Sequence, residues 1–233
     1  MADLDLPYSG NVSPNSVPLG TGPLSSSERE RLARGCQRAI EWHAGSVRKQ
    51  SRIPYVSHLF GVSGLVLEHG GTPDQAIAGL LHDALEDTQA SLAEIRDEFG
   101  PEVARIVEAC TDATKEQRAA DHNGDLSDSA AWARRKRHYV DQMEMADPAV
   151  ALVAACDKRH NLGTIVRALR TEGPAYLERF NGDAAHQIWY YSEVTGVLVP
   201  KVPVALGAEL DELLADLRAL LPDAAEKAEA LEY

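Results

Sequence analysis

Hydrophobic residues recur at helical spacing through most of the chain. From about residue 30 to residue 221, apolar side chains return every three to four positions, as they do on one face of an α-helix. The clearest case is residues 73–85, where Pro73 suits the first position of a helix. No stretch alternates apolar and polar residues as a half-buried strand would. The pattern therefore predicts an all-α fold.

Caps, prolines and glycines divide this pattern into separate helices. We expect them over residues 27–43, 58–69, 73–85, 91–99, 101–110, 130–145, 148–169, 183–199 and 203–221. The first is predicted to begin at a Ser-x-x-Glu capping box formed by Ser27 and Glu30. Residues 116–128 are polar and contain a glycine, which predicts a mobile loop.

The length of 233 residues suits one domain with tails. Residues 1–25 are rich in Ser, Pro, Gly and Asn, so we expect a disordered or loosely packed, flexible tail there. Residues 26–200 are expected to form one compact domain. Residues 201–233 are expected to form a helical extension that packs on this domain or follows it.

Composition narrows the class of protein. The chain carries 23 basic and 36 acidic side chains, a net charge of −13, which argues against a broad surface for nucleic acid or anionic membrane. Three cysteines are too few for a secreted disulfide scaffold, and the acidic N-terminus predicts no signal peptide. The longest apolar run, Ala149–Cys156, is too short to span a bilayer. We therefore expect a soluble cytoplasmic protein.

Four ionisable residues gather just after an apolar stretch, in the run Leu80–Thr88. On a helix, His82 lies one turn from Glu86, and Asp83 lies one turn from Asp87. Imidazole and carboxylate groups are ligands for divalent transition metals, so a metal ion is one partner that would hold them near a core. A solvated helix end is the alternative reading.

A second cluster follows the apolar run Ala149–Cys156, which predicts a buried helix. Asp157 comes next, with Asn161 and Thr164 farther along the same stripe. A carboxylate this close to a core needs a metal ion or a basic partner, and an internal ion pair remains open. A lone histidine, His58, opens an earlier predicted helix and by itself is typical of a core or capping residue.

Taken together, these residues resemble a known family. The order of His58, then His82 and Asp83, then Asp157 resembles the H…HD…D pattern of the HD-domain metal-dependent phosphohydrolases. The resemblance is especially close to the RelA/SpoT hydrolase domain and its stand-alone relatives, the small alarmone hydrolases. It covers residues 28–200. The runs that carry it are His43–Lys49, Pro54–His58, His82–Thr88, Phe99–Gly100 and Asp157–Thr164.

The resemblance implies a role for each matching residue. The metal ligands would be His58, His82, Asp83 and Asp157, with Mn²⁺ the usual ion and other divalent transition metals left open. The catalytic acids that act on the attacking water would be Glu86 and Asp87. The substrate-binding residues would be Arg48, Lys49, Asn161, Thr164 and, from the basic run 134–137, Arg137.

The activity that the resemblance implies is hydrolysis of the 3′-pyrophosphate of (p)ppGpp or its adenosine analogue, with release of pyrophosphate. Outside the matching residues the chain is too short for a synthetase domain, so we expect degradation and not synthesis.

One alternative is a phosphatase acting on NADPH or another 2′- or 3′-phosphorylated nucleotide. Others are a non-catalytic nucleotide sensor and a helical interaction module with the acidic stretch 209–232 as its surface. A homo-oligomer is also left open.

Three features depart from the family pattern. The loop between Lys49 and His58 is one residue longer, and it borders the base pocket, so the choice of base stays open. Arg159 replaces an apolar residue, and the sequence suggests no partner for it. The segment from Arg179 to Tyr191 does not align with the bifunctional enzymes, although it resembles one in the small hydrolases. It offers a tyrosine that could pack on the ribose, and a core aromatic is the alternative.

The distribution of charge refines the expected substrate. Residues 1–57 and 113–170 each carry a net charge of +2, whereas residues 58–112 carry −9 and residues 171–233 carry −8. The two positive segments contain Arg48, Lys49 and the basic run 134–137. A small, highly anionic nucleotide held between two basic segments is therefore compatible with the acidic overall balance.

Overall fold

The computed structural model describes residues 22–48, 51–112, 128–180 and 182–231. Over these residues the chain is helical, with loops and an isolated β-bridge between Val47 and Pro54. The all-α prediction is confirmed. The predicted tail (residues 1–25) and the predicted loop (residues 116–128) lie almost entirely outside the described residues.

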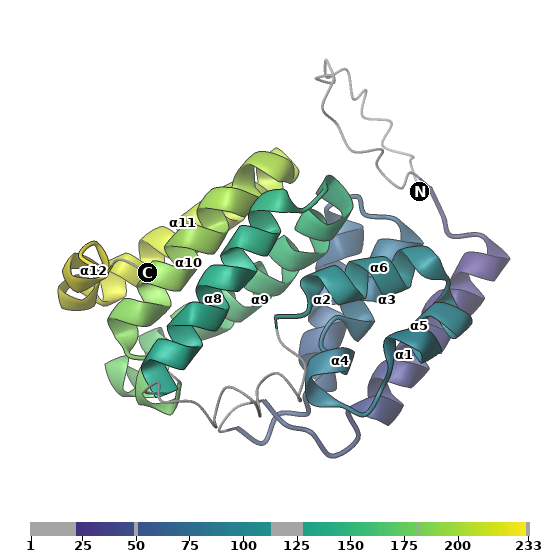
Figure 1. Cartoon of the computed structure of the whole chain (residues 1–233), viewed down its shortest axis with the longest axis horizontal. Coiled ribbons are helices and arrows are strands. Elements are labelled where there is room, and N and C mark those ends of the chain that lie inside the picture. Colours follow the sequence, from purple (N-terminus) through teal and green to yellow (C-terminus); the bar gives the residue numbers. More distant parts are fainter. Residues whose placement is uncertain (1–21, 49–50, 113–127, 181, 232–233) are drawn as a thin grey trace, which may run out of the picture.

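The helices follow the predicted segments closely, with short additional helices between them (Figure 1). The α-helices are α1 (Ser26–Trp42), α2 (Val56–Glu68), α3 (Pro73–Leu81), α4 (Ala84–Asp87), α5 (Leu92–Phe99), α6 (Pro101–Cys110), α8 (Asp128–Met145), α9 (Pro148–Glu172), α10 (Ala184–Leu198), α11 (Val204–Leu220) and α12 (Pro222–Ala228). Two 3₁₀ helices, η1 (Pro174–Arg179) and η2 (Val199–Lys201), flank α10.

The capping box of α1 lies two residues earlier than predicted. The Ser25 hydroxyl accepts from the Glu28 N–H at 3.3 Å, and the Glu28 carboxylate accepts from the Ser25 N–H at 2.7 Å. The run of three serines offers two Ser-x-x-Glu registers, and the prediction of Ser27 and Glu30 is wrong because the motif alone does not choose between them. The earlier register extends the helix at its N-terminus.

α9 is the central helix of the molecule. It packs against α2, α3 and α6 on one side and against α10 and α11 on the other, so it joins the N-terminal helices to the C-terminal ones (Figure 1). Its residues from Val150 to Cys156 are buried, which confirms the buried helix predicted there. Asp157 therefore enters the interior at the seam between the two groups of helices.

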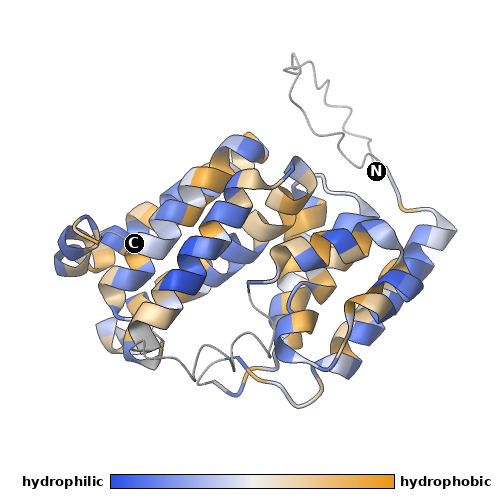
Figure 2. Ribbon diagram, viewed as in Figure 1, coloured by the Kyte–Doolittle hydropathy of each residue, from blue (hydrophilic) through white to orange (hydrophobic). Residues whose placement is uncertain are grey.

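Hydrophobic and hydrophilic positions alternate along the helices of both groups (Figure 2), and most of the buried side chains are apolar. α11 lies along α9, and α12 packs against α10. Across the described residues, no helix combines the length and the apolar character that a membrane span needs.

Candidate metal centre and active site

A turn at His82 and Asp83 interrupts the helix predicted over residues 73–85. α3 ends at Leu81, and Asp83 has φ −93° and ψ 0° before α4 begins. This backbone region is sparsely populated and is frequent in active sites. The prediction of one continuous helix is wrong, and Glu86 and Asp87 lie on the separate helical turn α4.

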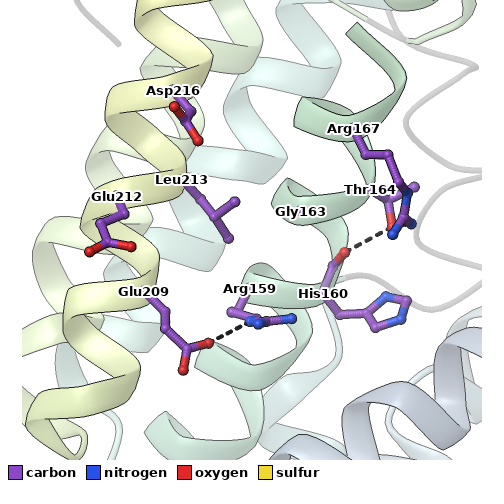
Figure 3. Close-up of a pocket in the computed structure, with 9 residues that line it drawn as sticks. All are labelled: Arg159, His160, Gly163, Thr164, Arg167, Glu209, Glu212, Leu213 and Asp216. Carbon is purple, nitrogen blue, oxygen red and sulfur yellow. Dashed lines mark hydrogen bonds and ion pairs between the residues drawn. The ribbon is translucent and has the colours of Figure 1, made fainter. Parts of the chain in front are cut away.

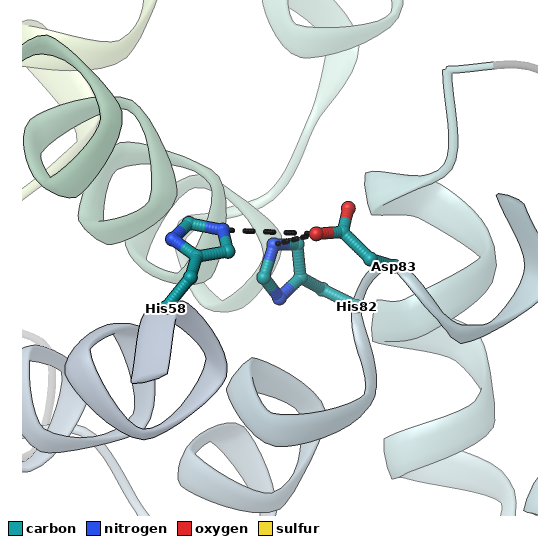
Figure 4. Close-up of side chains that lie close together, drawn as sticks. All are labelled: His58, His82 and Asp83. Carbon is teal, nitrogen blue, oxygen red and sulfur yellow. Dashed lines mark ion pairs between the residues drawn. The ribbon is translucent and has the colours of Figure 1, made fainter. Parts of the chain in front are cut away.

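The four predicted metal ligands converge at the seam between α2, α3 and α9. The Nε2 atom of His58 lies 3.2 Å from Asp157 Oδ1 and 3.6 Å from Asp83 Oδ2. The Nε2 atom of His82 lies 3.1 Å from Asp83 Oδ2 and 3.6 Å from Asp157 Oδ1. Figure 4 shows the two imidazoles and the Asp83 carboxylate directed toward one another. His58, His82 and Asp83 each place one donor atom within 4.8 Å of the others, and Asp157 Oδ1 borders the two imidazoles.

This donor set fits a divalent transition metal ion. The Nε2 atoms of His58 and His82 are buried and have no hydrogen-bond partner in the described part of the chain. Burial lowers the pKa of His58, which favours its neutral imidazole. Burial acts in the same direction on His82, but the Asp83 and Asp157 carboxylates raise its pKa well above the usual value, so His82 would release a proton when a metal ion binds. Burial alone would raise the pKa of Asp157, but the neighbouring Lys158 ammonium and the two imidazoles hold it well below its usual value. Neutral imidazole and ionised carboxylate are the forms that bind a metal ion.

Two side chains of α9 hold the Asp157 carboxylate. Lys158 donates from Nζ to Oδ2 at 2.7 Å, and Asn161 donates from Nδ2 to Oδ1 at 2.5 Å. The Lys158 ammonium also lies 4.4 Å from the centre of the Tyr139 ring. The internal ion pair, one of the two predicted alternatives, is therefore present. It coexists with the imidazole cluster because Lys158 contacts Oδ2 of Asp157, whereas the imidazoles face Oδ1.

Asp83 and Asn161 connect the cluster to the segment around residues 46–55. The Tyr55 hydroxyl donates to Asp83 Oδ2 at 2.5 Å. Burial, reinforced by the Asp83 charge, raises the pKa of Tyr55 well above its usual value, so the phenol stays a donor. Arg48 donates to Asn161 Oδ1 at 2.7 Å and lies 5.7 Å from the centre of the Tyr55 ring. Lys49, predicted beside Arg48, lies outside the described residues.

The predicted catalytic acid Glu86 is held by the chain that follows α6. Its Oε1 atom accepts from the backbone N–H of Asp112 at 2.6 Å. Asp112 in turn pairs with Lys136 of α8 at 2.6 Å, and the Lys136 ammonium lies 4.9 Å from the centre of the Tyr190 ring. Glu86 is partly buried, whereas Asp87 is exposed.

A cavity of about 330 Å³ lies between α9 and α11 (Figure 3). Thr164, predicted to bind the nucleoside, lines it, and so does His160. Arg159 pairs with Glu209 of α11 at 2.7 Å, so the long cationic side chain at this position has an acidic partner. The other lining residues are Gly163, Arg167, Glu212, Leu213 and Asp216.

Arg137 contacts α10. Its guanidinium pairs with Glu193 at 2.8 Å and lies 5.1 Å from the centre of the Trp189 ring. Tyr190 and Tyr191 are 4% and 6% exposed, so both are core aromatics, the alternative that the sequence left open. The role predicted for Arg137 stays a prediction.

Sequence reasoning missed four polar residues that support the site. Tyr55 and Lys158 lie within the family-like runs Pro54–His58 and Asp157–Thr164. Their closeness in sequence to His58 and Asp157 could have identified them. Lys136 belongs to the basic run, but its register on α8 decides that it, and not its neighbour, reaches Asp112. Nothing in the sequence marked Asp112 itself.

A protein-family model and several known proteins match this chain. A family model described as "HD domain" matches residues 35–179. A GTP pyrophosphokinase of Streptomyces coelicolor is 34% identical over 149 residues, which are 64% of this chain and 16% of that protein. The chain therefore spans about a sixth of the length of that relative.

A shorter relative matches over most of its length. The guanosine-3′,5′-bis(diphosphate) 3′-pyrophosphohydrolase MESH1 of Mus musculus is 31% identical over 148 residues, 62% of this chain and 75% of that protein. Among solved structures, a metazoan ortholog of SpoT that hydrolyzes ppGpp has a TM-score of 0.63 and 24% identity, covering 86% of this chain and 100% of its own. At that identity the structural likeness supports the fold.

Proposed function

Because the chain belongs to the HD-domain family, we propose that it is a metal-dependent hydrolase that removes the 3′-pyrophosphate of an alarmone nucleotide, (p)ppGpp or its adenosine analogue. The single observation that carries the proposal is the convergence of His58, His82, Asp83 and Asp157 on one buried space. The similarity to MESH1, a named 3′-pyrophosphohydrolase, supports the choice of reaction.

We assign Mn²⁺ to the cluster, held by the two imidazole Nε2 atoms and the carboxylates of Asp83 and Asp157. When bound, such an ion acts as a Lewis acid and lowers the pKa of coordinated water. Lys158 and Asn161 keep the Asp157 carboxylate oriented, and Tyr55 does the same for Asp83. Partners of this kind orient ligands and strengthen metal binding.

The reaction adds water to the phosphorus bonded to the 3′ oxygen and breaks that P–O bond, leaving a 3′-hydroxyl and pyrophosphate. Glu86 accepts the proton of the attacking water, and Asp87 orients the water from the same helical turn. The Asp112 N–H holds the Glu86 carboxylate in place through Oε1.

Substrate contacts are assigned to both sides of the cluster. Arg48 and Lys49 would contact the nucleotide, Asn161 and Thr164 would line the nucleoside pocket, and Arg137 would contact the pyrophosphate. The substrate is a small anionic nucleotide, and we propose a cytoplasmic protein that uses no nucleic acid or membrane partner. The oligomeric state is left open.

Product analysis tests the reaction. With Mn²⁺, the purified protein is expected to convert ppGpp to GDP and pyrophosphate, and EDTA should stop turnover until Mn²⁺ is added in excess. Incubation with ppGpp, ppApp and NADPH, followed by mass spectrometry, identifies substrate and product together. Orthophosphate with NADH would instead support the phosphatase, and no product from any of them would contradict a hydrolase.

Replacing Arg48 with alanine is expected to raise KM for the nucleotide about 10- to 100-fold, with a smaller change in kcat, because a hydrogen bond to a charged group contributes about 1.5–3 kcal/mol. Arg48 approaches the cluster through Asn161, whereas Arg52, four residues away, is exposed. The matched variant Arg52→Ala removes the same charge. A similar rise in KM for both variants would show only a general electrostatic effect.

A further inference from the structure

We infer that His160 is a positioning residue that holds His58 with its Nε2 atom directed into the metal cluster. The inference rests on the proposed metal site, and it concerns a residue outside the predicted ligand set. The Nδ1 atoms of His58 and His160 lie 2.9 Å apart, and the ring centroids are separated by 4.7 Å. His160 extends from the same turn of α9 that supplies Asp157.

The hydrogen bond between the two rings has one direction that suits metal binding. A nitrogen that binds a cation uses its lone pair, so a metal-binding Nε2 of His58 requires the proton to be on Nδ1. His58 Nδ1 then donates and His160 Nδ1 accepts. A partner on the second ring nitrogen fixes both the tautomer and the ring orientation of a metal-binding histidine.

The second histidine of the cluster shows the same arrangement with a different acceptor. His82 Nδ1 donates to the backbone carbonyl of Gly79 at 2.8 Å. A carbonyl oxygen can only accept, so His82 carries a proton on Nδ1, and Nε2 is the nitrogen that faces the cluster. Each imidazole therefore has an acceptor behind it, a carbonyl for His82 and a side chain for His58. The side-chain acceptor is the one that substitution can remove.

Gly61 makes room for the His160 ring. It lies on α2, three residues after His58, and a Cβ atom at this position would overlap the Nε2 and Cδ2 atoms of His160. Gly64, one turn farther along α2, has no atom within 4 Å of an added Cβ. A glycine inside a helix costs about 1 kcal/mol relative to alanine. The close approach of α9 gives Gly61 a structural purpose that Gly64 lacks.

His160 also lines the cavity between α9 and α11, together with Thr164. The same residue therefore contacts both His58 and this cavity. Displacement of the ring should therefore be detected first as weaker metal binding, which is measurable without any nucleotide.

Four variants test the inference through the affinity of the metal-free protein for Mn²⁺, measured by calorimetric titration. His160→Phe keeps a ring but cannot accept a hydrogen bond, and Mn²⁺ affinity is expected to fall about 10- to 100-fold. His160→Gln restores an acceptor and should recover most of the affinity. Gly61→Ala pushes the ring aside and should reproduce the loss, whereas the matched Gly64→Ala should bind Mn²⁺ as the wild type does.

The melting temperature of each metal-free variant separates positioning from packing. If His160 only filled space, His160→Phe would bind Mn²⁺ normally, and that result would overturn the inference. Equal losses for Gly61→Ala and Gly64→Ala would also overturn it. Because no nucleotide is present, a wild-type protein that binds Mn²⁺ in a His160-dependent manner but hydrolyses no alarmone would refute the proposed reaction and leave the inference standing.

Discussion

Replacement of Asp83 with alanine is expected to lower nucleotide hydrolysis about 10³-fold or more. Asp83 Oδ2 lies 3.1 Å from His82 Nε2 and 3.6 Å from His58 Nε2, so its loss removes one of two carboxylates from the cluster. A catalytic cation stabilises transition-state charge by several kcal/mol, and about 1.4 kcal/mol corresponds to a factor of ten in rate. Loss of about 4 kcal/mol therefore gives the expected decrease.

The measurement is kcat/KM at saturating Mn²⁺, with the metal content of each protein determined in parallel. Asp83→Asn serves as a second variant that removes the charge but keeps the local contact, because its amide oxygen can still accept the hydrogen bond from the Tyr55 hydroxyl. Asp97→Ala removes an exposed carboxylate from α5 and should leave activity unchanged. Wild-type turnover by the alanine variant would place the metal ion elsewhere and contradict the proposed centre.

Much of the fold was predictable because several helices have their boundaries marked in the sequence. Pro73 and Pro101 stand at the first position of α3 and α6, and Gly100 ends α5 with φ 95°. The break at Asp83 was not predictable, because neither a proline nor a glycine marks it. The backbone turn occurs where His82 and Asp83 meet His58 and Asp157, which are distant in the sequence, and helical periodicity contains no information about such contacts.

The candidate metal ligands were predictable from the sequence for a different reason. Histidine and aspartate beside apolar runs are chemically conspicuous, and their order along the chain resembles a family pattern. The supporting residues were less accessible because their roles depend on tertiary contacts. Lys158 is adjacent to Asp157 in sequence, but its place beside Tyr139 depends on α10, which packs against both α8 and α9. The partner of Arg159 is Glu209, which lies 50 residues farther along the chain, on α11.

The charge pattern along the chain gains a structural meaning from these contacts. The acidic segment 58–112 contributes Asp83, Glu86 and Asp112, and the basic segment 113–170 contributes Lys136 and Lys158. Lys136 pairs with Asp112, and Lys158 pairs with Asp157, so acidic and basic groups meet around the cluster. The net negative charge of the chain therefore says little about the local field that a nucleotide would meet.

Replacement of Glu86 with glutamine is expected to lower kcat about 10²- to 10⁴-fold, the usual contribution of a general base, while the affinity for Mn²⁺ stays unchanged. Glutamine can still accept the Asp112 N–H through its amide oxygen, so the position of the side chain is kept. What it cannot do is take up a proton from water. Pre-steady-state and steady-state turnover of ppGpp, with a parallel Mn²⁺ titration, measure the two properties separately.

Two companion variants decide which acid is the base. Glu86 is partly buried beside the chain after α6, whereas Asp87 is exposed, so Asp87→Asn should reduce kcat less than Glu86→Gln. Glu30→Gln changes an exposed glutamate of α1 and should have no effect. If Asp87→Asn instead abolished turnover while Glu86→Gln retained it, the proton would pass to Asp87. Burial would then be a poor guide to the base, because the water would approach from the exposed side of α4.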